Sequence, residues 1–109
     1  MTVTLKDNSV RIANLQPGMI IGHTIVASIF REHGFNCVIT SGCEHRALHS
    51  ITSLHYAGAA LDYRCRHIPT GQLPELIEDI RKALGGEFDV VPETDHLHVE
   101  LQPHREFLR

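Results

Sequence analysis

The sequence has no apolar run that approaches the roughly 20 residues an α-helix needs to cross a bilayer. Its first residues, MTVTLKDNSV, also lack the basic segment followed by an apolar segment that marks a secretory signal. We therefore expect synthesis in the cytoplasm and no membrane partner. Export would need another route.

An excess of basic side chains is missing as well. The chain has 10 Lys and Arg against 13 Asp and Glu, which gives a formal net charge of -3 at pH 7. Such a balance provides no electrostatic footprint for nucleic acid, so we expect no nucleic-acid partner. A chain of 109 residues can bury one modest core but not two, and we expect a single domain over residues 1–109.

Cysteine is scarce, whereas histidine is abundant. The three cysteines include no C-x-x-C pair, which argues against a disulfide framework and a cysteine zinc knuckle and favours buried or half-buried free thiols. The chain has nine histidines. Several of them cluster in two short windows, which hold His45, His49 and His55, and then His96 and His98. This clustering is the strongest compositional indication of function.

Apolar periodicity predicts two helices. Residues 17–33 carry apolar side chains at helical spacing, with Pro17 in the first turn and Gly34 at the C-terminal cap. LPELIEDIRKALGG, residues 73–86, is an amphipathic helix that the two glycines end.

Alternating or β-branched segments predict the strands. VTLKDN and VRIANL indicate a small N-terminal hairpin or loose strands, and NCVITS, AALDYRC, EFDVV and HLHVEL indicate further strands. Residues 42–58 lack a periodic pattern and read as a long, functional loop. The order predicts an α+β fold, with a small, mainly antiparallel sheet and helices packed on one face.

Strand alternation brings polar side chains together. On HLHVEL, His96, His98 and Glu100 share one face, and on AALDYRC, Asp62 and Arg64 share one face. If the two strands are near neighbours with their apolar sides inward, Asp62 and His98 lie on the same polar face.

The segment before Asp62 can add a second imidazole. Gly58 permits a turn with positive φ, and the small residues around it let His55 fold back over the polar face. Two imidazoles and one carboxylate are the three-ligand set of a catalytic zinc site. An H-x-H pair alone is more often a solvated strand face. The conjunction of His55, Gly58, Asp62 and the H-x-H strand favours a metal site.

Two motifs resemble those of a known family. HSITSLHYAGAALD, residues 49–62, is similar to the zinc-binding signature S-x-H-x-x-G-x-A-x-D of the D-Ala-D-Ala carboxypeptidase and peptidoglycan endopeptidase metalloenzymes, in the variant shared with the Hedgehog signalling domain. DHLHVE resembles the second motif of that family, an H-x-H on a late strand. The resemblance covers residues 39–101 and extends to the short single-domain forms of bacteria and phages. It implies a Hedgehog/DD-peptidase-like fold and a zinc ion held by His55, Asp62 and His98.

The resemblance also implies catalytic roles. His96 is similar to the family histidine that holds the zinc water or the tetrahedral intermediate. The family places a general base a few residues before the last ligand, and we assign this role to Glu93. Asp95 is the second candidate, disfavoured because strand alternation would turn it away from the face of His98. Glu100 shares that face and is a candidate to orient a ligand imidazole.

The chain departs from the family in two places. Many members carry an arginine where this sequence has Ala59, and many carry S-G-x-R where Ser41-Gly42 is here separated from Arg46 by three residues. Arg46 is a candidate to clamp a substrate carboxylate or carbonyl. His49 occupies a rim position of the family site. These departures bear on substrate preference and not on the metal.

The resemblance predicts zinc-dependent hydrolysis of an amide in a peptidoglycan stem peptide, by a D,D-carboxypeptidase or an endopeptidase of endolysin type. Such an enzyme would act on the cell wall after release or within a phage particle, with phage virion components as further candidate partners. One alternative is a non-catalytic zinc-binding module, such as a phage structural or tail-associated protein. The other is a non-haem iron oxygenase, which uses two His and one carboxylate but normally needs a larger barrel.

Overall fold

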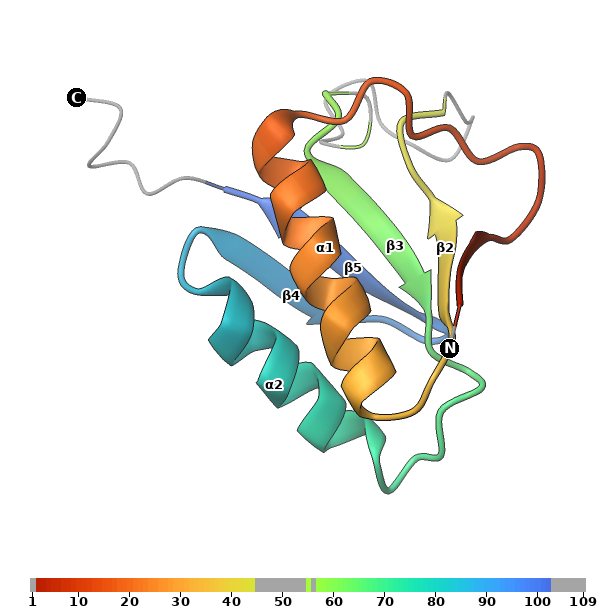
Figure 1. The fold of residues 1–109 in the computed structure, drawn as a ribbon, viewed down its shortest axis with the longest axis vertical. Helices are drawn as coiled ribbons and strands as arrows, with labels where there is room; N and C mark the ends of the chain where they lie inside the picture. Colours follow the sequence, from red (N-terminus) through yellow and green to blue (C-terminus); the bar gives the residue numbers. More distant parts are fainter. Residues whose placement is uncertain (1, 45–54, 56, 103–109) are drawn as a thin grey trace.

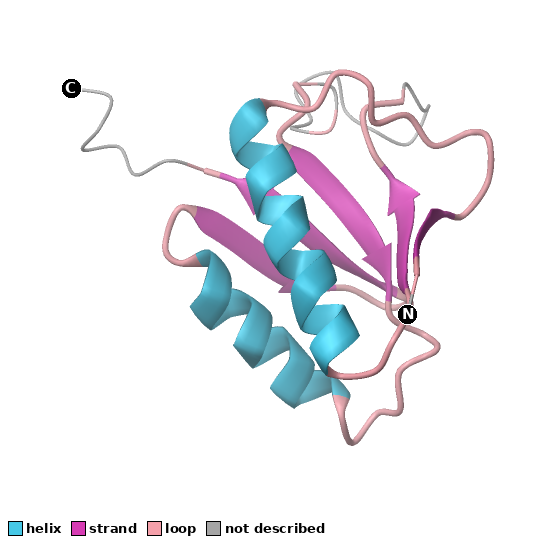
Figure 2. Cartoon of the chain, in the orientation of Figure 1, coloured by secondary structure: helices cyan, strands magenta, loops and turns pink. Residues whose placement is uncertain are grey.

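The computed structural model describes residues 2–44, 55 and 57–102. Its elements are, in chain order, β1 (Val3–Leu5), α1 (Pro17–Glu32), β2 (Cys37–Ser41), β3 (Ala60–Arg64), α2 (Leu73–Leu84), β4 (Phe88–Pro92) and β5 (His96–Leu101). The strands form a five-stranded sheet in the order β1-β2-β3-β5-β4. Both helices lie against one face of this sheet (Figures 1 and 2). The expected α+β class is therefore confirmed.

The sheet is mixed. β1 pairs with β2 in parallel, whereas the β2–β3, β3–β5 and β4–β5 pairs are antiparallel. Of the two segments expected to form an N-terminal hairpin or loose strands, VTLKDN contains the strand β1, whereas residues 10–15 form no strand and no hairpin forms. The backbone of Arg11 instead binds the turn after β2: its N–H donates to Glu44 Oε1 over 3.0 Å, and its carbonyl accepts from the Cys43 N–H over 2.6 Å.

Sequence signals account for the two helices. α1 begins at Pro17, and Gly34 follows its last turn with a φ of 82°. α2 ends before Gly85, whose φ is 83°. In both cases a glycine at the end of the helix has a positive φ, which a residue without a Cβ adopts at low steric cost.

The hydrophobic core lies between the helices and the sheet. Its fully buried side chains come from both layers and include Met19, Phe30, Leu61, Tyr63, Leu76, Ile80, Leu97 and Val99. Cys37, Cys43 and Cys65 are buried free thiols, as expected. Burial raises the pKa of Cys37 to about 12. The apolar faces of β3 and β5 are turned into this core, so their polar faces are turned to the open side of the sheet.

The long loop expected over residues 42–58 is described only in part. Most of it falls on residues 45–54 and 56, which lie outside the described ranges. Within the part of the chain that the structure describes, neither helix is long and apolar enough to span a bilayer.

Candidate metal centre

β3 and β5 bring the two windows of the sequence together. They are antiparallel neighbours, and their register pairs Asp62 with His98 and Arg64 with His96. The predicted placement of Asp62 and His98 on one face is therefore confirmed, and it is the face opposite the helices.

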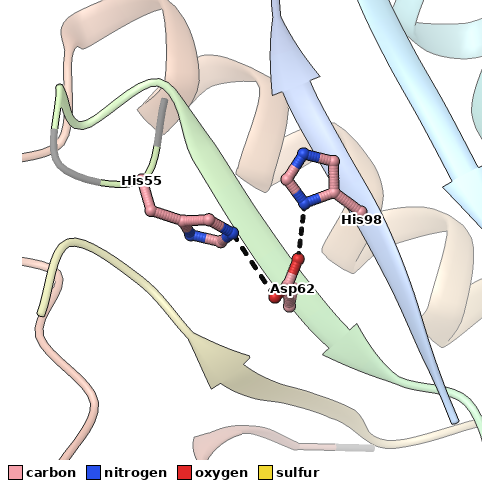
Figure 3. Close-up of side chains that lie close together, drawn as sticks. All are labelled: His55, Asp62 and His98. Carbon is pink, nitrogen blue, oxygen red and sulfur yellow. Dashed lines mark hydrogen bonds and ion pairs between the residues drawn. The ribbon is translucent and has the colours of Figure 1, made fainter. Parts of the chain in front are cut away.

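A tight turn delivers His55 to the same face. The Gly58 N–H donates to the His55 carbonyl over 3.0 Å, and Gly58 has a φ of 73°. A Cβ at position 58 would lie 2.1 Å from the carbonyl oxygen of Asn14, so only glycine fits against the segment that leads into α1. This close contact fixes the backbone of the turn next to the first residue of β3. The imidazole of His55 is directed at Asp62 (Figure 3).

The three expected ligands converge on one point. Nε2 of His55 lies 3.4 Å from Oδ2 of Asp62, and Nδ1 of His98 lies 2.7 Å from Oδ1 of Asp62 (Figure 3). Ligand atoms from all three side chains lie within 4.8 Å of one another, and His55 and Asp62 are buried. Ligand atoms about 2.0–2.1 Å from a tetrahedral zinc ion are roughly 3.3 Å apart, which is close to the His55–Asp62 separation.

The outer ring nitrogens have partners of the kind that metal-ligating histidines have. Nδ1 of His55 lies 2.9 Å from the Gly42 carbonyl oxygen, and Nε2 of His98 lies 2.7 Å from Oε1 of Glu100. A carbonyl oxygen can only accept, so Nδ1 of His55 carries a proton and Nε2 is the ring atom directed at Asp62. Nε2 can donate a proton to Asp62 or, without that proton, bind a cation together with Asp62. The donor set therefore fits a divalent metal.

The charges of the site are strongly coupled. Burial opposes ionisation of Asp62, but hydrogen bonding to His55 and His98 outweighs burial and holds the pKa of Asp62 well below its usual range. The hydrogen bond to Asp62, aided by Glu100 and opposed by burial, raises the pKa of His98 to about 9. Asp62 is thus a permanent anion at the centre of the site.

His96 lies beside the three expected ligands and contacts two further carboxylates. Its Nε2 lies 3.0 Å from Oε2 of Glu93 and 3.7 Å from Oδ2 of Asp62, and its Nδ1 lies 2.9 Å from Oδ1 of Asp95. The reason given for disfavouring Asp95 is wrong, because Asp95 precedes β5 and strand alternation does not apply to it. The choice of Glu93 over Asp95 as base stays a prediction.

A cavity of about 680 Å³ opens over these residues. The three expected ligands, His96, Glu93 and Asp95 all line it. Three cations that were not proposed as site residues also line it, namely Lys6, Arg64 and Arg66. The alternation that places Asp62 on this face also places Arg64 there. No sequence signal placed Lys6, because the segment that holds it was expected in a hairpin.

Glu44 is a second residue that the sequence did not reveal. Its buried carboxylate accepts hydrogen bonds from Ser41 Oγ over 2.5 Å, from the Arg11 N–H over 3.0 Å and from the Gly42 N–H over 2.8 Å. Burial raises the pKa of Glu44, but these bonds outweigh it and bring the pKa below its usual range. Glu44 thereby fixes Gly42, whose carbonyl orients His55. The expected residues Arg46 and His49 lie outside the described part of the chain.

Comparison with known proteins gives no match for this chain, either among protein-family models or among curated protein sequences.

Proposed function

We propose that this protein is a zinc-dependent hydrolase that cuts an amide bond in bacterial peptidoglycan stem peptides, on a Hedgehog/DD-peptidase-like fold. The observation that carries the proposal is the convergence of His55, Asp62 and His98 in a cavity that also holds His96 and Glu93, whose Nε2 and Oε2 atoms lie 3.0 Å apart. The cell-wall substrate class and the fold family rest on the resemblance of the two sequence motifs.

The donor chemistry favours zinc. Imidazole suits zinc, and two imidazoles with one carboxylate leave room for a further ligand in a tetrahedral site. When bound, zinc would polarise the scissile carbonyl and lower the pKa of water at the site.

The protein's own residues supply the proton transfers. In the proposed reaction, Glu93 takes a proton from the attacking water as the water oxygen bonds to the carbonyl carbon. The same carboxyl group then gives that proton to the amine nitrogen as the carbon–nitrogen bond breaks. His96, whose Nε2 lies 3.0 Å from Glu93, donates a hydrogen bond to the oxygen that becomes negatively charged.

The first prediction separates metal binding from hydrolysis. Purified wild-type protein should contain zinc by elemental analysis and release peptide fragments from purified peptidoglycan. Glu93→Gln should keep the zinc and lose ~10²–10⁴-fold in rate, because a general base is removed and no ligand is touched. Asp95→Asn is the matched control and should retain measurable activity.

Other outcomes would redirect the assignment. Loss of activity in Asp95→Asn with activity retained in Glu93→Gln would make Asp95 the base. Zinc in the wild type without hydrolysis of any murein peptide would favour the non-catalytic zinc-binding module.

A further inference from the structure

One side of the cavity is built from cations. Lys6 directly follows β1, Arg64 is the last residue of β3, and Arg66 lies just beyond it. All three line the same cavity as the candidate metal ligands. The acids that line the cavity outside the ligand set, Glu93 and Asp95, come from the turn between β4 and β5.

These cations have no carboxylate partner among the residues that the structure describes. The ion pairs found around the cavity in that part of the chain all join a histidine to Asp62, Glu93, Asp95 or Glu100. Arg66 contributes to lowering the pKa of Asp95, after the larger effect of the hydrogen bond to His96, but it makes no ion pair with it. The chain has a net charge of -3, and yet three cations face the same cavity. Because like charges repel, this arrangement is unfavourable in the absence of an anion.

Arg64 stands at a useful distance from the reacting groups. It lies two residues beyond Asp62 on the same strand face, so the two backbone positions are about 6.6 Å apart. It is also paired across the sheet with His96. Since successive Cα atoms of a peptide are about 3.8 Å apart, a group one or two residues from an amide at Asp62 falls within reach of Arg64.

We propose that Arg64, supported by Arg66 and Lys6, binds a carboxylate of the substrate and makes the enzyme selective for peptides with a free carboxylate close to the scissile amide. This inference rests on the proposed amide hydrolysis. A guanidinium suits a carboxylate because its planar fork donates two parallel hydrogen bonds. Arg64 is half-buried, which shields its charge from solvent, whereas Lys6 and Arg66 are exposed and add mainly to the local potential.

The test uses the zinc-loaded protein and a matched pair of probes. One probe is an N-acetylated stem peptide with its carboxylates free, and the other is the same peptide with every carboxylate converted to carboxamide. Titration calorimetry should show about 10- to 100-fold tighter binding of the acid form to the wild type, as expected for a hydrogen-bonded charge pair. Where hydrolysis is observed, the preference should appear mainly in KM.

Three variants locate the preference. Arg64→Gln should bind the two peptides almost equally, with its affinity for the carboxamide unchanged. Arg66 lies past the end of β3, so Arg66→Gln leaves the strand pairing in place. This variant should reduce the preference about 2- to 5-fold, the scale of an exposed ion pair. Lys82→Gln makes the same charge change at an exposed position on α2, away from the cavity, and should behave as wild type.

The outcomes separate this proposal from the proposed function. Equal binding of both peptides by the wild type would overturn the subsite, even if both are hydrolysed. A preference that survives in Arg64→Gln would overturn it too, because the metal alone would then select the carboxylate. A preference lost in Arg64→Gln, in a protein that hydrolyses neither peptide, would support the subsite and overturn the enzyme.

Discussion

His96 and His98 occupy neighbouring positions on one face of β5 but have different partners. Both ring nitrogens of His98 are held by carboxylates, Asp62 on the inner side and Glu100 on the outer side. His96 is held by Glu93 and Asp95 and reaches Asp62 only at 3.7 Å. In the proposed site, these partners favour His98 as the metal ligand and His96 as the residue that contacts the substrate.

Alanine substitution should separate these two roles. We expect His98→Ala to lose most of its zinc, because only two of the three proposed ligands remain. We expect His96→Ala to keep its zinc and to lose about 100-fold or more in the rate of peptide hydrolysis, the scale of an oxyanion donor. Elemental analysis and a rate assay on the same preparations check both.

An anomalous-scattering map of zinc-loaded crystals provides the control. Zinc placed on His96 in the wild type, or full zinc occupancy in His98→Ala, would contradict the assignment.

At the scale of elements, the turn after β2 supports the candidate metal site. Glu44 gathers hydrogen bonds from Ser41, Gly42 and Arg11, and Gly42 in turn accepts from His55. We interpret Glu44 as a positioning residue for His55.

The anchor should depend on pH. The pKa of Glu44 is lower in the folded protein than the ordinary value of about 4.3, so its stabilising contribution is present above that value and is lost as the pH falls through the folded pKa. Glu44→Gln should therefore lower the free energy of unfolding by about 1–3 kcal/mol at pH 7 and by much less at pH 3. Urea unfolding of both proteins with a chelator present measures the difference without any contribution from metal.

Glu87→Gln is a suitable control, because Glu87 is exposed and directly precedes β4, an edge strand that β3 and β5 separate from β2. A loss of stability in Glu44→Gln that is equal at both pH values would contradict the charged anchor.

Local patterns in the sequence predicted the local parts of this structure. Apolar spacing and the end-glycines gave both helices, and period-two alternation placed Asp62 and His98 on one face before any pairing was known. Gly58 also has the positive φ that was expected of a glycine at this turn.

Long-range pairing accounts for what the sequence did not reveal. Glu44 accepts a hydrogen bond from the backbone N–H of Arg11, which is 33 residues away in the chain. Lys6 reaches the cavity only because β1 pairs in parallel with β2, and such a register is fixed by tertiary contacts rather than by the strand's own residues. The orientation of Asp95 was not predictable from alternation, because Asp95 precedes β5, which begins at His96 as expected.

In the whole molecule, the two faces of the sheet carry different kinds of side chain. The helices and the apolar core cover one face, and the cavity with its charged side chains occupies the other. The candidate ligands come from β3, from β5 and from the turn at His55, so that a bound metal would tie the turn to two strands that are already paired.

Metal removal should therefore loosen the site face more than the helical face. A ligand that binds only the folded state adds about 2.7 kcal/mol at a concentration 100 times its Kd, and each kcal/mol shifts the Tm of a domain of this size by roughly 4–8 °C. We expect excess zinc to raise the Tm of chelator-treated protein by at least about 10 °C, and we expect no such rise in His98→Ala.

Hydrogen exchange should show added protection concentrated at the Gly58 amide, which bonds to His55, and in β5. Equal added protection across α2 would instead indicate that zinc stabilises the fold as a whole without specifically fixing the turn.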